Sequence, residues 1–190
     1  MLPVVAVALM ATTTGNEALA QSVQNLPVVN AVWQQNIEEQ VADAATEAET
    51  PKTLNELVDE QMDGEALDAE ARCLATAVYF EARSETLEGQ LAVAEVVMNR
   101  AASPLYPSSW CRVVKQYKQF SFVKGGRFPK IATSSDAWAN AKAITRVAIS
   151  GAHDVLEDDV LWYHANYVKP KWRHKLQRAA RVGVHVFYRA

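Results

Sequence analysis

Glu81 is the residue of this sequence whose placement most suggests acid–base chemistry. It continues the apolar stripe formed at helical spacing by Leu74, Ala77 and Val78, and it stands just before a break in the helical pattern at ARSETLEG. Burial disfavours the charged form of a carboxyl group, so the pKa of Glu81 should rise, as a general acid working near neutral pH requires. The sequence therefore predicts a catalytic acid at this position.

Three other glutamates stand near the same break and compete for this role. Glu85 and Glu88 fall in the break itself, where a carboxylate is usually solvated or caps a helix. Glu95 lies in the next apolar segment and is the chief rival. A buried glutamate held by Arg100 or Arg83 would instead be structural, because ion pairs also perturb pKa values.

Aromatic and amide side chains recur in two later segments of the chain. A groove with aromatic faces and hydrogen-bonding groups suits sugar rings, which are apolar on their faces and polar at their edges. The alternative is that these residues are core, as about half of any strand must be. We expect substrate contacts from six residues, Gln119, Phe120, Ser121, Tyr163, His164 and Trp172.

The pattern of apolar residues predicts an α+β fold that is mainly helical, with a small antiparallel sheet. Two helices flank the break, the first from an N-cap at Asp68 to about Ala82 and the second from Thr86 or Leu87 to about Ala102. The second is apolar on most sides, so it should be central. Further elements are expected as a short helix over 110–114, a helix over 135–150, and strands over 119–123, 160–164 and 184–188.

Charge divides the chain into an acidic beginning and a basic remainder. Residues 1–70 hold 13 of the 22 acidic residues and a single basic one, Lys52, whereas residues 71–190 hold 9 acidic and 18 basic residues, a net charge of +9. A basic body favours an anionic partner, which can be nucleic acid, anionic lipid or an anionic cell-wall polymer. No nucleic-acid recognition motif is visible, so that class is disfavoured.

The first twenty residues are typical of a secretion signal. Leu2 to Ala11 is an apolar run too short to span a bilayer, and Ala18-Leu19-Ala20 is a cleavage pattern. The alternative is a buried N-terminal helix. We expect a signal peptide over 1–20, a disordered acidic arm over 21–66 and a compact domain over 67–190, exported to the periplasm or cell envelope, with no stable membrane insertion after cleavage.

Two cysteines, Cys73 and Cys111, predict one disulfide in an exported chain, with a catalytic thiol as the alternative. No metal site is expected, because the four histidines lie roughly ten residues apart and no H-E-x-x-H or paired-cysteine spacing occurs. No Gly-rich phosphate loop appears, so no cofactor is expected. A Ser-His-Asp triad stays open, although no G-x-S-x-G motif supports it.

The stretch from Cys73 to Arg100 resembles the opening motif of the SleB/CwlJ-type cell wall hydrolases, the spore-cortex-lytic enzyme family. The family pattern is an apolar helix, an E-A-R-G-E-like turn and then G-Q-x-A-V-A-x-V-V-x-N-R. Here the turn is EARSE from Glu81, followed by GQLAVAEVVMNR from Gly89. The resemblance continues through QFS at 119–121, YHA at 163–165, Pro170 and Trp172, and GVHVFY at 183–188, so it covers about residues 70–190.

This resemblance implies a lysozyme-like, transglycosylase-related fold and cleavage of peptidoglycan glycan strands, with Glu81 as the catalytic acid. The leading expectation is a lytic transglycosylase, in which one carboxylate suffices. A hydrolytic muramidase becomes more favoured if a second carboxylate lies across the cleft. An amidase and a non-catalytic peptidoglycan-binding module also stay open.

Two departures from the family pattern stand out. Ser84 replaces the usual glycine of the turn. Lys118 and Lys124 stand near places where many Gram-negative relatives carry a second cysteine pair, so a single disulfide is expected.

Overall fold

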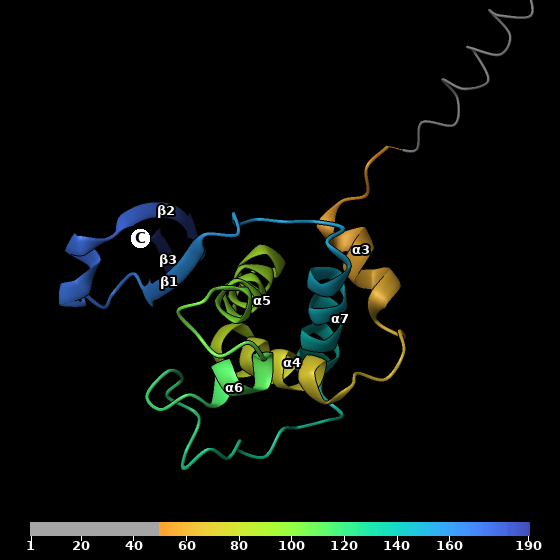
Figure 1. Ribbon diagram of the computed structural model, residues 1–190. Helices are drawn as coiled ribbons and strands as arrows, with labels where there is room; N and C mark the ends of the chain where they lie inside the picture. Colours follow the sequence, from red (N-terminus) through yellow and green to blue (C-terminus); the bar gives the residue numbers. More distant parts are fainter. Residues whose placement is uncertain (1–49) are drawn as a thin grey trace, which may run out of the picture. The chain divides into compact units, whose positions relative to one another are not determined.

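The computed structural model describes residues 50–190, and the expected signal peptide and most of the acidic arm lie outside this range. The elements in chain order are α3 (Leu54–Gln61), α4 (Ala69–Ala82), α5 (Leu87–Ala102), α6 (Trp110–Lys115), α7 (Asp136–Ser150), β1 (Val160–Ala165), the 3-10 helix η1 (Lys171–Lys175), β2 (Gln177–Val182) and β3 (His185–Arg189). The predicted mainly helical α+β class with a small antiparallel sheet is confirmed (Figure 1). None of the helices in this range is long and apolar enough to cross a membrane.

Helices α4 and α5 begin where their capping residues predict. The Asp68 carboxylate accepts a hydrogen bond from the Ala71 backbone N–H (2.7 Å), and the Thr86 hydroxyl accepts one from Gly89 (3.3 Å). These caps satisfy backbone donors that the first turn of a helix leaves free. Helix α5 is buried along nearly its whole length, which confirms its predicted central position.

Two apolar clusters meet on α5. The larger cluster joins α5 to helices α3, α4, α6 and α7. The smaller one joins Ala92 and Val96 of α5 to Val160 and Phe187 of the sheet. In Figure 1, α5 accordingly lies between α7 and the blue strands. Because both clusters share this helix, α5 fixes the sheet relative to the helical layer.

The sheet has three antiparallel strands in the order β1-β3-β2. Tyr163 of β1 pairs with Phe187 of β3, and Ala165 pairs with His185. Strands β1 and β3 agree with the sequence prediction, but β2 was not predicted. The burial of its residues, QRAARV, does not alternate, and few of them favour a strand. Its place in the sheet comes from its pairing with β3.

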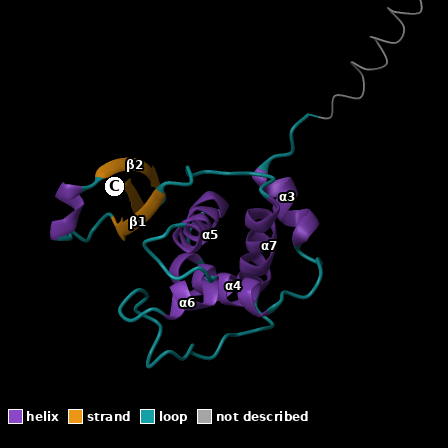
Figure 2. Cartoon of the chain, in the orientation of Figure 1, coloured by secondary structure: helices purple, strands orange, loops and turns teal. Residues whose placement is uncertain are grey.

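The predicted strand over 119–123 is wrong, because this segment forms turns within the long loop between α6 and α7 (Figure 2). Its aromatic alternation has a different cause. Phe122 stacks on Phe80 of α4 with ring centroids 4.8 Å apart, and Phe120 lies 5.6 Å from Phe122. Both rings therefore pack into the helical cluster from a loop, without any partner strand.

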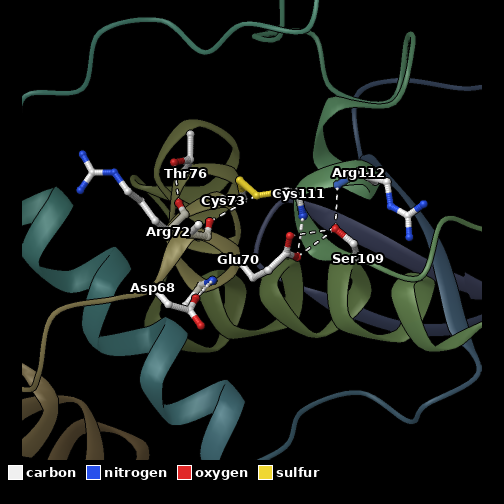
Figure 3. The surroundings of a disulfide bond; sticks show 10 residues. Asp68, Glu70, Arg72, Cys73, Thr76, Ser109, Cys111 and Arg112 are labelled. Atoms are coloured by element: carbon white, nitrogen blue, oxygen red, sulfur yellow. Dashed lines mark hydrogen bonds between the residues drawn. A yellow bond between two sulfur atoms is a disulfide. The ribbon is translucent and has the colours of Figure 1, made fainter.

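The predicted disulfide between Cys73 and Cys111 is present and joins α4 to α6 (Figure 3). Beside it, the Glu70 carboxylate accepts hydrogen bonds from the Ser109 hydroxyl (2.9 Å) and from the Cys111 backbone N–H (3.1 Å). Ser109 also caps α6 by accepting from the Arg112 N–H (3.3 Å). A covalent bond and a small polar network thus hold the start of α6 against α4.

The folded unit begins at Lys52, earlier than the expected boundary at residue 67. Leu54 and Val58 of α3 are 5% and 2% exposed and belong to the main core. Arg146 of α7 donates to the carbonyls of Gln61 (2.8 Å) and Gly64 (2.8 Å), at and just after the end of α3. For residues 52–66 the structure thus differs from the expected disordered arm. The charged residues of this segment suggested solvation, whereas its spaced apolar residues are buried by α7.

The turn between α4 and α5 is tied to the sheet by Glu85. Its Oε2 accepts a hydrogen bond from the Val184 backbone N–H (3.0 Å), at the turn between β2 and β3. Gly183 adopts φ +55°, and a Cβ atom at this position would collide with the same carboxylate oxygen. A glycine is therefore needed here both for the left-handed backbone and for the close approach of Glu85.

We expect Leu54→Ala to lower the free energy of unfolding by about 2–5 kcal/mol, because it opens a cavity between α3 and α7. Urea unfolding followed by circular dichroism measures the change. Leu105→Ala is the matched control, since Leu105 is 65% exposed, and should change stability by less than about 0.5 kcal/mol. Equal, small effects of both substitutions would mean that α3 does not contribute to the folded unit.

Gly183→Ala should destabilise the protein more than Gly151→Ala. Both glycines have positive φ, so alanine costs about 1–2 kcal/mol of backbone strain at either site. Only Gly183 also lies against a side chain, whereas nothing lies within 4 Å of a Cβ at Gly151. We expect about 0.5–1.5 kcal/mol of additional loss at Gly183 in urea unfolding, because the Glu85 carboxylate must move away and give up its hydrogen bond to Val184. Equal losses would contradict the proposed tether between Glu85 and the β2–β3 turn.

Candidate active site

A cleft of about 1090 Å³ opens between the end of α4, the segment 115–126 and the end of β1. It brings together residues from segments far apart in sequence. The predicted site residues that line it are Glu81, Gln119, Phe120, Ser121, Tyr163 and His164. Trp172 is not among the lining residues. It packs edge-on against His164 (5.6 Å between ring centroids) and Tyr188 (5.6 Å), so its contact with substrate stays a prediction.

Glu81 lies in the last turn of α4, where the helix reaches the cleft wall. Burial raises the pKa of its carboxyl group, while the Tyr163 hydroxyl and the Arg100 charge oppose this rise. The Tyr163 hydroxyl donates to Glu81 Oε2 at 3.4 Å. Desolvation is the largest of these effects, so the pKa of Glu81 lies above that of a free glutamate, in the direction that the sequence predicts.

Arg100 is a buried cation in the floor of the same cleft. It comes from the last turn of α5, is 3% exposed, and donates from Nε to the Leu161 carbonyl (2.7 Å). Its guanidinium carbon lies 5.7 Å from the Tyr163 ring centroid and 5.4 Å from that of Tyr106, distances suited to cation–π attraction. Burial lowers the pKa of Arg100, but an arginine remains charged under ordinary conditions.

His185 also lines the cleft, and the sequence did not single it out. It is 5% exposed and contacts the Tyr163 ring edge-on, with centroids 5.1 Å apart. Burial lowers the pKa of its imidazole, while the charge of Glu85 opposes this change. Its Nδ1 has no hydrogen-bond partner in the described part of the chain. Its position in the motif GVHVFY was the one sequence signal that pointed to it.

The rival carboxylates do not line the cleft. Glu85 binds the Val184 N–H, and Glu88 is exposed in the first turn of α5. Glu95 accepts a hydrogen bond from the Val155 N–H (2.9 Å), on the loop before β1. Burial raises the pKa of Glu95 to about 7, yet it does not line the cleft. Among the described residues, Glu81 is therefore the one acid in the cleft wall.

This arrangement can support general acid–base catalysis by a single carboxyl group. Glu81 can donate a proton and take one back, with Tyr163 and Arg100 beside it to stabilise the intervening carboxylate. Within residues 50–190, no group of three or more histidine, cysteine or acidic side chains is placed to hold a metal ion. Proton transfer at Glu81 is therefore the chemistry that the side chains of the cleft support best.

Comparison with known proteins identifies the relatives of this chain. It is 32% identical to the spore cortex-lytic enzyme of Bacillus subtilis over 126 residues, covering 66% of this chain and 39% of that protein. It is also 28% identical over 117 residues to the spore cortex-lytic enzyme of Oceanobacillus iheyensis, covering 60% of this chain and 39% of that protein. The chain thus spans about two fifths of the length of these relatives.

Solved structures show the same fold. The catalytic domain of the germination-specific lytic transglycosylase SleB from Bacillus anthracis superposes with a TM-score of 0.55 at 28% identity, covering 67% of this chain and 98% of that one. The catalytic domain of Bacillus cereus SleB gives a TM-score of 0.55 at 26% identity, covering 68% and 96%. The predicted transglycosylase-related fold is confirmed.

The family model described as Cell Wall Hydrolase matches residues 84–188. The match begins at Ser84, after Glu81, and includes Arg100, Tyr163 and His185. It spans more than half of the chain. It covers α5, the segment 115–126 that lines the cleft, β1, β2 and β3 up to Tyr188. The resemblance inferred from the turn motif is confirmed, and the chain belongs to the Cell Wall Hydrolase family.

Proposed function

We propose that this protein is a peptidoglycan lytic transglycosylase that cleaves the β-1,4 bond between N-acetylmuramic acid and N-acetylglucosamine. The observation that carries the proposal is the single carboxyl group of the cleft wall, Glu81, whose pKa is raised by burial. The names of the relatives, spore cortex-lytic enzyme and lytic transglycosylase, support the same activity. Glycan strands of peptidoglycan are the proposed substrate.

In the proposed mechanism, protonated Glu81 first acts as the general acid. It donates its proton to the glycosidic oxygen while the bond from that oxygen to the muramyl C1 breaks, leaving an oxocarbenium-like centre at C1. The Tyr163 hydroxyl, 3.4 Å from Glu81 Oε2, and the nearby Arg100 charge stabilise the resulting carboxylate.

Glu81 then acts as the general base in the second half of the reaction. Its carboxylate takes the proton of the muramyl 6-hydroxyl as O6 bonds to C1, which closes an anhydro ring and restores the acid. The nucleophile is supplied by the substrate, so no second carboxylate is required. Hydrolytic glycosidases instead use two carboxyl groups, about 5–5.5 Å or about 6.5–9.5 Å apart.

The competing functions are less well supported by the geometry. A hydrolytic muramidase needs a second acid across the cleft, but Glu85 and Glu95 bind backbone N–H groups elsewhere. A binding module would not require the raised pKa of Glu81. An amidase of stem peptides has no support from the names of the relatives. Because the proposed substrate lies in the cell wall, we also propose that the chain is exported.

Product analysis tests the proposal directly. The full chain is incubated with purified sacculi, and the soluble products are identified by mass spectrometry. We expect anhydro-muropeptides from the wild type, and a loss of about a hundredfold to ten-thousandfold in their rate of formation in Glu81→Gln. Glu95→Gln is the matched control, a buried glutamate outside the cleft, and should retain activity.

Different products would assign a different reaction. Reducing muropeptides would indicate a hydrolytic muramidase, and free stem peptides an amidase. Binding to sacculi without any product would favour the binding module. Full activity of Glu81→Gln would overturn the role of Glu81.

The pH dependence of cleavage should report the protonation of Glu81. Because the acid form starts the reaction, kcat/KM should fall as pH rises through the pKa of Glu81. The hydrogen bond from Tyr163 favours the carboxylate and lowers this pKa, so Tyr163→Phe should raise it and move the alkaline limb to higher pH.

Tyr188→Phe is the control for this shift. It also removes a tyrosine hydroxyl, but that hydroxyl is 2.9 Å from His164 Nε2 and does not contact Glu81. The fall of kcat/KM at alkaline pH should occur at the same pH in Tyr188→Phe as in the wild type. A Tyr163→Phe profile that is unchanged, or moved to lower pH, would contradict the proposed coupling between Tyr163 and Glu81.

A further inference from the structure

The cleft carries far more positive charge than its acid–base chemistry uses. Against the single carboxyl of Glu81, its lining includes the buried Arg100 and three exposed lysines, Lys115, Lys118 and Lys124. Lys115 ends α6, and the other two lie in the loop that follows. The three lysines therefore form one wall of the cleft, called the lysine wall below.

No carboxylate in the described part of the chain forms an ion pair with the lysine wall. The ion pairs within residues 50–190 involve Lys52 and Arg189. Lys115 instead lies over the Phe128 ring (5.1 Å from Nζ to the centroid) and Lys118 over the Tyr117 ring (5.1 Å). These contacts leave the ammonium groups without a counter-charge. Phe128 lines a neighbouring pocket with Lys115, so Lys115 stands at the border of that pocket and the cleft, whereas Tyr117 lines the cleft itself.

Lys118 is held in a backbone conformation that its side chain disfavours. It has φ +61° and is the one non-glycine residue with positive φ in residues 50–190. It occupies the third position of a turn closed by the Gln119 N–H donating to the Gln116 carbonyl (3.0 Å), where positive φ favours glycine or asparagine. Folding alone would favour glycine or asparagine at this position, and the turn places the Lys118 side chain in the cleft lining.

Beside Lys118, Tyr117 is 85% exposed although it lines the same cleft. An aromatic ring with so little burial contributes little to the core. It is, however, placed to stack on the apolar face of a sugar ring next to the lysine wall. The turn thus offers two kinds of contact, one for a ring and one for an anion.

We propose that the lysine wall binds the carboxylates of the stem peptides attached to the glycan, so that the enzyme selects peptide-bearing strands over uncharged ones. This inference rests on the proposed function, because it takes peptidoglycan as the substrate of the cleft. Stem peptides fit better than the single lactyl carboxylate of a bare strand, because three ammonium groups spread over an exposed wall can meet several carboxylates at once.

A sacculus-binding assay tests the inference without relying on turnover. The full chain carrying Glu81→Gln is pelleted with three preparations. These are native sacculi, sacculi whose carboxyl groups have been converted to amides, and native sacculi in the presence of excess soluble glycan strands that have been freed of stem peptides and carry only lactyl carboxylates. We expect native sacculi to bind about tenfold more tightly than amidated ones, a preference that weakens as salt is raised. The soluble peptide-free strands should compete only weakly for binding to native sacculi.

Substitution of the lysines should remove the same preference. Lys115, Lys118 and Lys124 are changed to Gln together, and the control changes Lys142, Lys171 and Lys175, which lie outside the cleft lining, so that net charge falls equally. The cleft variant should bind native sacculi about tenfold more weakly and amidated sacculi as before. The control variant should keep the preference for native sacculi.

Specific outcomes would overturn the inference. Equal binding of native and amidated sacculi, or equal losses in the cleft and control variants, would exclude carboxylate recognition by the lysine wall. Peptide-free strands that abolish binding to native sacculi, but not to amidated ones, would assign the wall to the lactyl carboxylate instead. None of these results would alter the products formed by the wild type, so a failure here is distinct from a failure of the transglycosylase proposal.

Discussion

The proposed chemistry depends on the burial of one carboxyl group at the end of a helix. Desolvation raises the pKa of Glu81, and this rise is held in check by a tyrosine hydroxyl and a buried guanidinium. The two partners come from different elements, Tyr163 from β1 and Arg100 from the last turn of α5. Their geometry relative to Glu81 is maintained because α5 packs on α4 on one side and on the sheet on the other.

The same constraint links the fold to the proposed chemistry. A single carboxyl group that first donates and then accepts a proton must stay in place relative to the substrate during both transfers. A rigid protein framework around it favours this. The disulfide between α4 and α6 and the bond from Glu85 to the β2–β3 turn provide that rigidity on both sides of Glu81. The loop between α6 and α7 carries two of the three lysines of the lysine wall, so the proposed substrate selection and the proposed proton transfer involve different parts of the cleft.

Sequence reasoning located the acid because its signal is local. Glu81 interrupts an apolar stripe within one helix, and helix caps mark where that helix begins. Arg100 and His185 could not be assigned to the site in this way, since they reach the cleft only through the packing of α5 and β3. The aromatic alternation at 119–123 was misinterpreted because loop residues can also place every second ring in a core. Glu95 shows that a raised pKa also occurs at a carboxyl group outside the cleft, so the pKa alone does not locate the candidate site.

The central claim is that the substrate's own hydroxyl, rather than water, completes the reaction after Glu81 has donated its proton. Digestion of purified sacculi by the full chain in water enriched in oxygen-18 measures this most directly. We expect the new muramyl ends to be anhydro rings that carry no oxygen-18. Muramyl ends that carry one oxygen-18 atom would mean that water attacks C1, and would contradict the single-carboxylate mechanism.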